Sequence, residues 1–243
     1  MNAFTIFPAI DLRQGRVVRL RQGDPAQETH YGDDPLAATR RWQAAGATWL
    51  HVVNLDGALD ESGRANMAAL EKILTSGLSI QFGGGMRELD SLRRALELGV
   101  SRAVIGTAAV ENPALIEAAL AAFGPERIAV GIDAQAGIVR THGWKEAAGV
   151  TAIELGRQWA DKGVRWVIFT DIARDGASSG VNVTATASLA RQTSLSVIAS
   201  GGVVSLEDVR RVRQAGLAGV IIGRALYEGQ IRLEDALAVG TDL

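Results

Sequence analysis

Cysteine is absent from the 243 residues of this chain. Its absence excludes disulfides, thiolate nucleophiles, zinc–cysteine sites and iron–sulfur clusters. Long apolar runs are also absent, since no stretch reaches the roughly 18 residues needed to span a bilayer. The beginning of the chain lacks the basic segment and the cleavage site of a secretion signal. We therefore expect a cytoplasmic protein that has no membrane partner.

A strong charge of either sign is lacking as well. The formal net charge is −2, which gives no bulk attraction to nucleic acid or to an anionic membrane. The three histidines, His30, His51 and His142, lack the spacing of a metal site, and His51, inside an expected strand, is interpreted as structural. Neither a Rossmann nor a Walker A glycine pattern is present. We expect no nucleic-acid partner and no metal, which leaves room for a small anionic ligand.

What the chain does contain is a regular alternation of short β-rich runs and segments of helical period. The runs cover 4–11, 49–55, 78–83, 102–106, 127–133, 164–171, 195–200 and 219–223. Some, such as AVIG and GVIIG, are continuously apolar, which is typical of parallel strands covered on both faces. Eight strands alternating with helices predict βα units joined by right-handed crossovers. No linker interrupts them, so we expect one α/β domain over 1–243.

An internal repeat gives this alternation its organisation. GGMRELDSLRRALELGVSRAVIG (84–106) aligns with GGVVSLEDVRRVRQAGLAGVIIG (201–223) without gaps. A period of about half the chain is too long for a solenoid, whose units run roughly 20 to 50 residues. It predicts two half-barrels, about 1–123 and 124–243, that close into a (βα)8 TIM barrel with two-fold internal symmetry. A doubly wound open sheet is the alternative, but it would not explain the likeness of the halves.

Two of the expected strands end in similar sequences, FPAIDLRQG at 7–15 and AVGIDAQAG at 129–137. Active sites of (βα)8 barrels lie at the carboxyl ends of the strands, so Asp11 and Asp133 would face each other from opposite sides of the ring. Paired carboxylates in that position suit acid–base work on a substrate held between them. A single Asp there is more often the cap of a turn. The duplication favours a catalytic role for both.

Glycine-rich loops follow four of the expected strands, in two matched pairs: FGGGMR with ASGGV, and IGTA with IGRA. Glycine lets the backbone come close to a ligand because it has no β-carbon. Short helical turns after IGTA and IGRA would present N–H groups to an anion, and phosphate sites after the last two strands are frequent in such barrels. The loops predict two phosphate pockets and a bisphosphorylated substrate; tight turns are the alternative explanation.

Further candidates rest on weaker grounds. TDIARDG places Thr170 and Asp175 at the end of the sixth expected strand, with Gly176 in a mobile loop, although an Asp-Gly turn explains Asp175 equally well. Trp144, in THGWKE, is expected on the loop after the fifth strand, where it could stack on a heterocycle or close the site. Arg19, in VVRLRQGD, is expected on the loop after the first strand, where it either screens a phosphate or faces solvent.

Taken together, PAIDL, FGGG, GID, GW, TDI..DG and SGGV resemble the ProFAR isomerase family of histidine biosynthesis. The full name is phosphoribosylformimino-5-aminoimidazole carboxamide ribotide isomerase. The likeness runs from residue 4 to about residue 237. It implies a (βα)8 barrel that opens the ribose of a bisphosphorylated aminoaldose and converts it to the aminoketose. This Amadori rearrangement needs no metal or redox cofactor.

The resemblance also implies roles for the candidates. Asp11 would be the general base, Asp133 the general acid and Thr170 a helper near the amine, with Asp175 as the second candidate for the acid. Arg19, Trp144 and Gly176 would complete the substrate site. The phosphates would lie at Gly84, Gly85, Gly106 and Thr107 on one side and at Gly201, Gly202, Gly223 and Arg224 on the other. A monomer is the default expectation.

Three alternatives remain. The cyclase of imidazole glycerol phosphate synthase shares the fold and the paired aspartates, but its first strand has a Cys-leading pattern and then a Lys, where this chain has Pro-Ala-Ile-Asp and Arg19. A bifunctional isomerase that also acts on phosphoribosyl anthranilate in tryptophan biosynthesis is compatible with Arg19. Its usual Arg-rich stretch before Gly-Trp is not seen, since this chain has VRTHGW there. A non-catalytic phosphate-binding scaffold would leave the two carboxylates unexplained.

Overall fold

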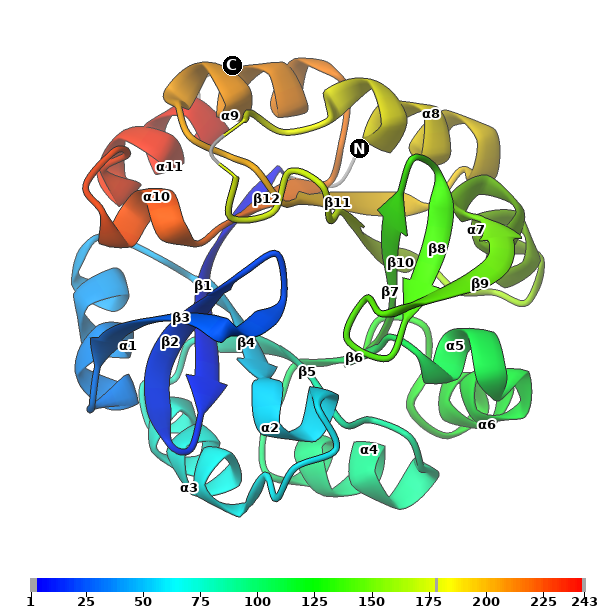
Figure 1. Cartoon of the computed structure of the whole chain (residues 1–243), viewed down its shortest axis with the longest axis horizontal. Coiled ribbons are helices and arrows are strands. Elements are labelled where there is room, and N and C mark those ends of the chain that lie inside the picture. The colour runs from blue at the N-terminus through cyan, green and yellow to red at the C-terminus, as the bar shows by residue number, and fades with distance from the viewer. Residues whose placement is uncertain (1–3, 178, 242–243) are drawn as a thin grey trace.

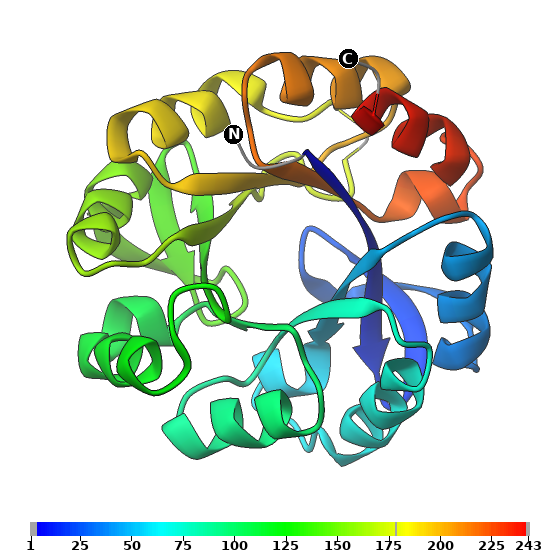
Figure 2. The same cartoon turned by 180° about the vertical axis from the view of Figure 1, so that it is seen from behind.

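Eight parallel strands close into a ring in the computed structural model, which describes residues 4–177 and 179–241 (Figures 1 and 2). The strands are β1 (Thr5–Arg13), β4 (Trp49–Asn54), β5 (Ser79–Gly83), β6 (Arg102–Ile105), β7 (Ile128–Gln135), β10 (Trp166–Asp171), β11 (Ser196–Ser200) and β12 (Gly219–Ile222). β12 pairs in parallel with β1 and β10 with β7, so the ring has no free edge. The prediction of a (βα)8 barrel is confirmed, while the internal repeat stays a prediction.

Helices cover the outside of the ring (Figure 1). The longer ones are α1 (Pro35–Ala44), α3 (Arg64–Leu74), α4 (Leu89–Glu97), α6 (Pro113–Phe123), α7 (Ala152–Asp161), α8 (Val183–Thr193), α9 (Leu206–Gln214) and α11 (Leu233–Thr241). Short helices α2 (Leu55–Ala58), α5 (Ala108–Glu111) and α10 (Arg224–Tyr227) follow strands at the barrel mouth. Local signals explain several helix starts: Asp34 caps α1 before Pro35, and Ser205 forms a capping box with Asp208. No helix in the described ranges is long and apolar enough to cross a membrane.

The core has two layers because successive strand residues point to opposite faces. Side chains that point outward pack against the helices, for example Leu50, Phe82 and Ile105, which are fully buried. Side chains that point inward fill the lower barrel, in a cluster of Phe7, Ala9, Val104, Ala129, Ile168, Ile198 and Ile221. The barrel is therefore a packed core in its lower part, and a ligand has room at its carboxyl end.

A cation–π sandwich closes the opposite end of the barrel. The guanidinium carbon of Arg102 lies 4.9 Å from the ring centre of Trp49 and 3.9 Å from that of Trp166. These three residues are the first of β4, β6 and β10. Burial lowers the pKa of Arg102 to about 10, and one of its amino groups donates to Gln81 at 3.4 Å. This cluster is the floor of the barrel.

Two antiparallel excursions were not predicted from the sequence: β2 (Arg16–Arg21) with β3 (Asp24–Gly32), and β8 (Ile138–Thr141) with β9 (Glu146–Thr151). They follow β1 and β7, the two strands that carry the paired aspartates (Figure 1). Three of their turns are two-residue turns with both φ angles positive, at 14–15, 22–23 and 136–137. Turns of this type match the twist of a hairpin. Arg19 therefore lies on a strand, β2, and the expectation that it lies in a loop is wrong.

Candidate active site

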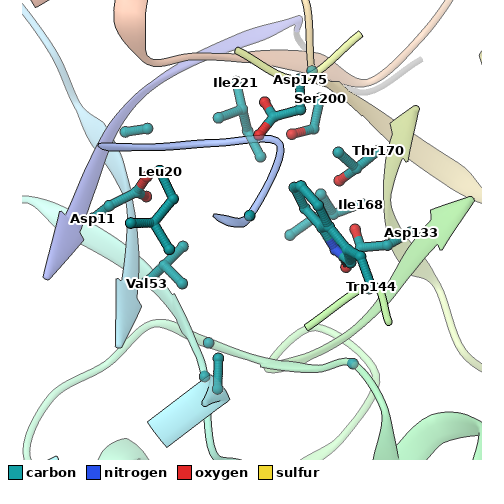
Figure 3. Close-up of a pocket in the computed structure, with 18 of the residues that line it drawn as sticks. Asp11, Leu20, Val53, Asp133, Trp144, Ile168, Thr170, Asp175, Ser200 and Ile221 are labelled. Carbon is teal, nitrogen blue, oxygen red and sulfur yellow. Dashed lines mark hydrogen bonds between the residues drawn. The ribbon is translucent and has the colours of Figure 1, made fainter. Parts of the chain in front are cut away.

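The mouth of the barrel holds a cavity at the carboxyl ends of the strands (Figure 3). Its volume is about 260 Å³. Every residue that the sequence singled out lines it: Asp11, Arg19, Gly84, Gly85, Gly106, Thr107, Asp133, Trp144, Thr170, Asp175, Gly176, Gly201, Gly202, Gly223 and Arg224. Residues from all parts of the chain thus meet at one place, as a (βα)8 barrel requires.

On one side of the cavity, Arg19 holds two carboxylates. Its Nη1 donates to Oδ2 of Asp11 at 2.8 Å, and its Nη2 donates to Oδ1 of Asp175. Burial alone would lower the pKa of Arg19, but Asp175 and Asp11 outweigh it and the pKa lies above the ordinary value. Burial raises the pKa of Asp175, with Arg19 opposing. Because a guanidinium can serve two carboxylates at once, this triad ties the loop after β10 to the β1–β2 hairpin.

On the other side, Asp133 has only neutral hydrogen-bond partners among the residues that the structure describes. Its Oδ2 accepts a hydrogen bond from Nε1 of Trp144 at 2.8 Å, and Thr170 on the neighbouring strand β10 also donates to it. Burial raises the pKa of Asp133, and these two hydrogen bonds oppose that shift without cancelling it. Figure 3 shows Asp133 and Asp11 on opposite sides of the cavity, with the Trp144 ring pointing inward between them. A carboxyl group desolvated without a cation is suited to hold a proton.

The segment that carries Trp144 adopts an unusual backbone. His142, Gly143 and Trp144 have φ angles of 52°, 63° and 72°, in the left-handed region that costs free energy for residues other than glycine. Side chains fix the segment: Arg140 Nε donates to the carbonyl of Trp144 at 3.3 Å, and His142 Nε2 lies 2.6 Å from a carboxylate oxygen of Glu111. The strain places the indole over the cavity.

The glycine loops have a structural role that does not depend on any ligand. A β-carbon on Gly84, whose φ is 100°, would lie 2.1 Å from the carbonyl oxygen of Asn54. A β-carbon on Gly201, whose φ is 86°, would lie 2.9 Å from the carbonyl oxygen of Asp171. Close backbone packing therefore requires glycine at both positions. Gly106, by contrast, has open space where a β-carbon would be.

Several cavity residues were missed or misread by sequence reasoning. His51, interpreted as structural, lines the cavity; its Nδ1 is buried without a hydrogen-bond partner, and burial lowers its pKa to about 4, so it is neutral near pH 7. Ser200 and Gly23 line the cavity as well. Inward-facing alternation along the strands would have found His51 and Ser200. Gly23 could have been placed at the cavity only after the β2–β3 hairpin had been recognised.

The chemistry of the cavity follows from these contacts. It offers two carboxylates that share one cation, one carboxyl group in neutral surroundings and two sets of glycine-rich loop backbone. The described residues contain no cluster of His, Asp and Glu that could hold a metal ion. An eight-stranded parallel barrel with a cavity at the carboxyl ends of its strands is the architecture of (βα)8-barrel enzymes, and unlike carboxyl groups in that cavity suit acid–base chemistry.

Comparison with known proteins narrows this class to one family. The family model described as "Histidine biosynthesis protein" matches residues 5–232, and the chain belongs to that family. A relative from Acidiphilium cryptum is 49% identical over 243 residues, covering 97% of this chain and 98% of the relative. Another from Methylobacterium nodulans is 50% identical over 242 residues, covering 98% and 95%. Both are named 1-(5-phosphoribosyl)-5-((5-phosphoribosylamino)methylideneamino) imidazole-4-carboxamide isomerase, the enzyme that the sequence motifs resemble.

Proposed function

We propose that this protein is the isomerase of histidine biosynthesis that converts the aminoaldose ProFAR to its aminoketose. The observation that carries the proposal is the pair of unlike carboxyl groups, Asp11 beside Arg19 and Asp133 beside Trp144, across one cavity. The relatives named for this reaction, which match the chain over nearly its full length, support the same substrate.

Ring opening is the step assigned to Asp133. The acid gives its proton to the ring oxygen of the ribose as the bond from C1′ to that oxygen breaks, and the lone pair of the amine nitrogen forms a C=N bond. The raised pKa of Asp133 supports this role, because a general acid must hold its proton at the working pH. Thr170 assists at the amine. Asp175, whose pKa is also raised, is the second candidate for the acid.

Enolisation is the step assigned to Asp11. Its carboxylate removes the proton from C2′, which gives an enolamine. Asp11 then returns this proton at C1′ as the C2′ hydroxyl loses its own proton and becomes the carbonyl, and the hydroxyl proton restores the acid that opened the ring. Substrate and product contain the same atoms, so the reaction needs no oxidant. The hydrogen bond from Arg19 to Oδ2 of Asp11, at 2.8 Å, supports a fixed position for this carboxylate at the cavity. One general base contributes about 10²- to 10⁴-fold to a rate.

The two glycine loop sets are assigned to the two phosphates. Gly84, Gly85, Gly106 and Thr107 face one side of the cavity, and Gly201, Gly202, Gly223 and Arg224 face the other. Bare backbone lets N–H groups reach an anion closely. Binding at both ends would place the reacting ribose between the two aspartates. We extend the proposal to the two half-barrels, about 1–123 and 124–243, as copies of one unit within a single domain.

The decisive test is turnover of two substrates by the purified chain. We expect conversion of ProFAR, followed by absorbance or chromatography, and none of phosphoribosyl anthranilate. Turnover of both would establish the bifunctional isomerase instead. If the chain turned over neither but formed imidazole glycerol phosphate from the aminoketose in the presence of ammonia, it would be the cyclase; phosphate binding without any turnover would leave a scaffold.

A further inference from the structure

A bare α-carbon faces the indole of Trp144 across the mouth of the barrel. Gly23 is the second residue of the β2–β3 turn, and Trp144 lies between β8 and β9; both line the cavity. A β-carbon on Gly23 would lie 2.8 Å from Cε3, 3.2 Å from Cζ3 and 3.4 Å from Cδ2 of the indole. Carbon atoms in contact prefer about 3.5–4.0 Å. A larger residue at this position would therefore push the ring away.

The opposite edge of the same ring carries the hydrogen bond to Asp133. Nε1 of Trp144 donates to Oδ2 of Asp133 at 2.8 Å. The indole is a rigid plane, so a push on the six-membered ring moves the N–H as well. The backbone has little slack to compensate, because Trp144 is already in the left-handed region, and Arg140 holds its carbonyl. The β2–β3 turn thus shares control of the hydrogen bond with the loop that carries the indole.

We infer that Gly23 is a positioning residue: its missing side chain gives the Trp144 indole the place from which the N–H reaches the Asp133 carboxylate. The kinetic consequence of this inference rests on the proposed function, in which Asp133 is the acid. The contact itself does not depend on it. The β2–β3 hairpin then supplies Gly23, which leaves space for the indole, and the β8–β9 hairpin supplies the indole itself.

The sign of the effect follows from the partners of Asp133. Burial raises its pKa, and the hydrogen bonds from Trp144 and Thr170 lower it. Loss of the indole N–H therefore raises the pKa further. The other ionisable groups lining the cavity are Asp11, Arg19, His51, Arg140, Asp175 and Arg224, together with Arg87, which pairs with Asp60. A change at Gly23 removes none of these groups.

Gly23→Ala tests the contact, and Gly137→Ala is its matched control. Both glycines are the second residue of a two-residue turn, with φ angles of 74° and 83°. A β-carbon on Gly137 would meet nothing within 4 Å. Both variants therefore carry the same backbone strain, and only Gly23→Ala adds the contact with the indole. Trp144→Phe removes the N–H while keeping an aromatic ring.

The direct readout is the titration of the Asp133 carboxyl carbon by NMR, in protein labelled with ¹³C-aspartate and assigned with Asp133→Asn. We expect the midpoint to rise by about one pH unit in Gly23→Ala, as for the loss of one hydrogen bond to a buried carboxylate. Gly137→Ala should match the wild type. In the Trp144→Phe background, Gly23→Ala should produce no further shift, because the two changes act through one hydrogen bond. The descending alkaline limb of kcat/KM should follow the same pattern.

An unchanged midpoint in Gly23→Ala would overturn the inference, as would an equal shift in Gly137→Ala or a second shift in the Trp144→Phe background. Should Gly23→Ala fail to fold, the wild type provides the test. Nuclear Overhauser contacts are then expected between Gly23 Hα and the indole protons on Cε3 and Cζ3. Their absence would overturn the inference. A shifted midpoint in a chain that does not turn over ProFAR would reject the proposed function and retain the role of Gly23 in the contact.

Discussion

The two sides of the barrel mouth carry the same kind of acid in opposite surroundings. Asp11 shares the Arg19 guanidinium with Asp175, so its side is rich in charge. Asp133 receives hydrogen bonds from Trp144 and Thr170, and no cation from the described ranges is in direct contact with it. Two aspartates at corresponding strand ends have thus become unlike through the hairpins that follow them. The strand ends set where the two carboxyl groups lie, and the hairpins set which hydrogen bonds and charges surround each of them.

Removal of either carboxyl group should have the largest effect. We expect Asp11→Asn and Asp133→Asn each to lower kcat for ProFAR by about 10³-fold, with circular dichroism unchanged. Asp133→Asn should also abolish the alkaline limb of the pH profile, because that limb reports loss of the proton from the acid.

Asp175→Asn is the control for this assignment. Loss of the alkaline limb in Asp175→Asn, with the limb intact in Asp133→Asn, would move the acid to the charged side of the mouth. Near wild-type turnover in Asp11→Asn would refute the base.

Removal of the shared cation tests the charged side alone. Arg19→Met leaves two buried carboxylates without their partner, and we expect a loss of about 3 kcal/mol in the free energy of unfolding near pH 8. The pKa of Asp175 is already raised by folding, and loss of Arg19 raises it further. A carboxyl group with a raised folded-state pKa is stabilised when protonated, so the deficit should grow as pH rises through that pKa and shrink toward pH 4.

Urea unfolding at pH 5 and pH 8 measures this deficit. Arg16→Met on the same strand is the matched control, because Arg16 is 43% exposed and its ion pair with Glu28 is long, at 3.9 Å. A deficit that did not depend on pH would show that Arg19 stabilises the fold by packing rather than by charge.

Gly106→Ala and Gly223→Ala compare phosphate binding on the two sides. Neither glycine has a positive φ. A β-carbon on Gly106 would meet nothing within 4 Å, and one on Gly223 would meet atoms of Arg19 and Ala9 at 3.6 Å or more. Each β-carbon would occupy space assigned to a phosphate, so KM for ProFAR should rise about tenfold in each variant, with kcat less affected. Gly32→Ala, which is equally open but outside the cavity, should leave KM unchanged. An effect in only one of the two would assign phosphate binding to one side.

Thr170→Val should have the smallest effect and should act on the neutral side only. Loss of the hydroxyl removes one of the two hydrogen bonds that lower the pKa of Asp133, so the alkaline limb of kcat/KM should move up by about one pH unit. Thr170→Ser keeps the hydroxyl, so the alkaline limb should return to its wild-type position. A downward shift would mean that the hydroxyl does not stabilise the charged form.

The barrel and the members of the site could be predicted from the sequence because they depend on short-range patterns. Continuous apolar runs marked the parallel strands, and the duplicated Asp and glycine positions marked strand ends, which converge in any (βα)8 barrel. Glycine loops could be located in the same way. Their requirement for glycine has a packing cause, seen at Gly84 and Gly201, in addition to any role with phosphate.

The contacts that distinguish the two acids could not be predicted in this way. They depend on the hairpins, and the Gln-Gly and Ala-Gly turns that form them are weaker signals than Asn-Gly or Asp-Gly. Had the turn at 14–15 been recognised, pairing of Asp11 with Val18 would have placed Arg19 on the strand beside Asp11, one residue from its partner, although the register alone does not give the contact between the two side chains. The approach of Trp144 to Gly23 joins hairpins more than a hundred residues apart in the chain, and no local pattern encodes it.

The Trp49–Arg102–Trp166 floor has a consequence for how molecules reach and leave the cavity. In the part of the chain that the structure describes, these side chains lie at the end of the barrel opposite the cavity, so the mouth is the side from which a molecule reaches it. Substrate that enters and product that leaves then use the same opening, and each passes the same two hairpins. Contacts between the two hairpins, such as that of Gly23 with Trp144, therefore lie on the path of both molecules.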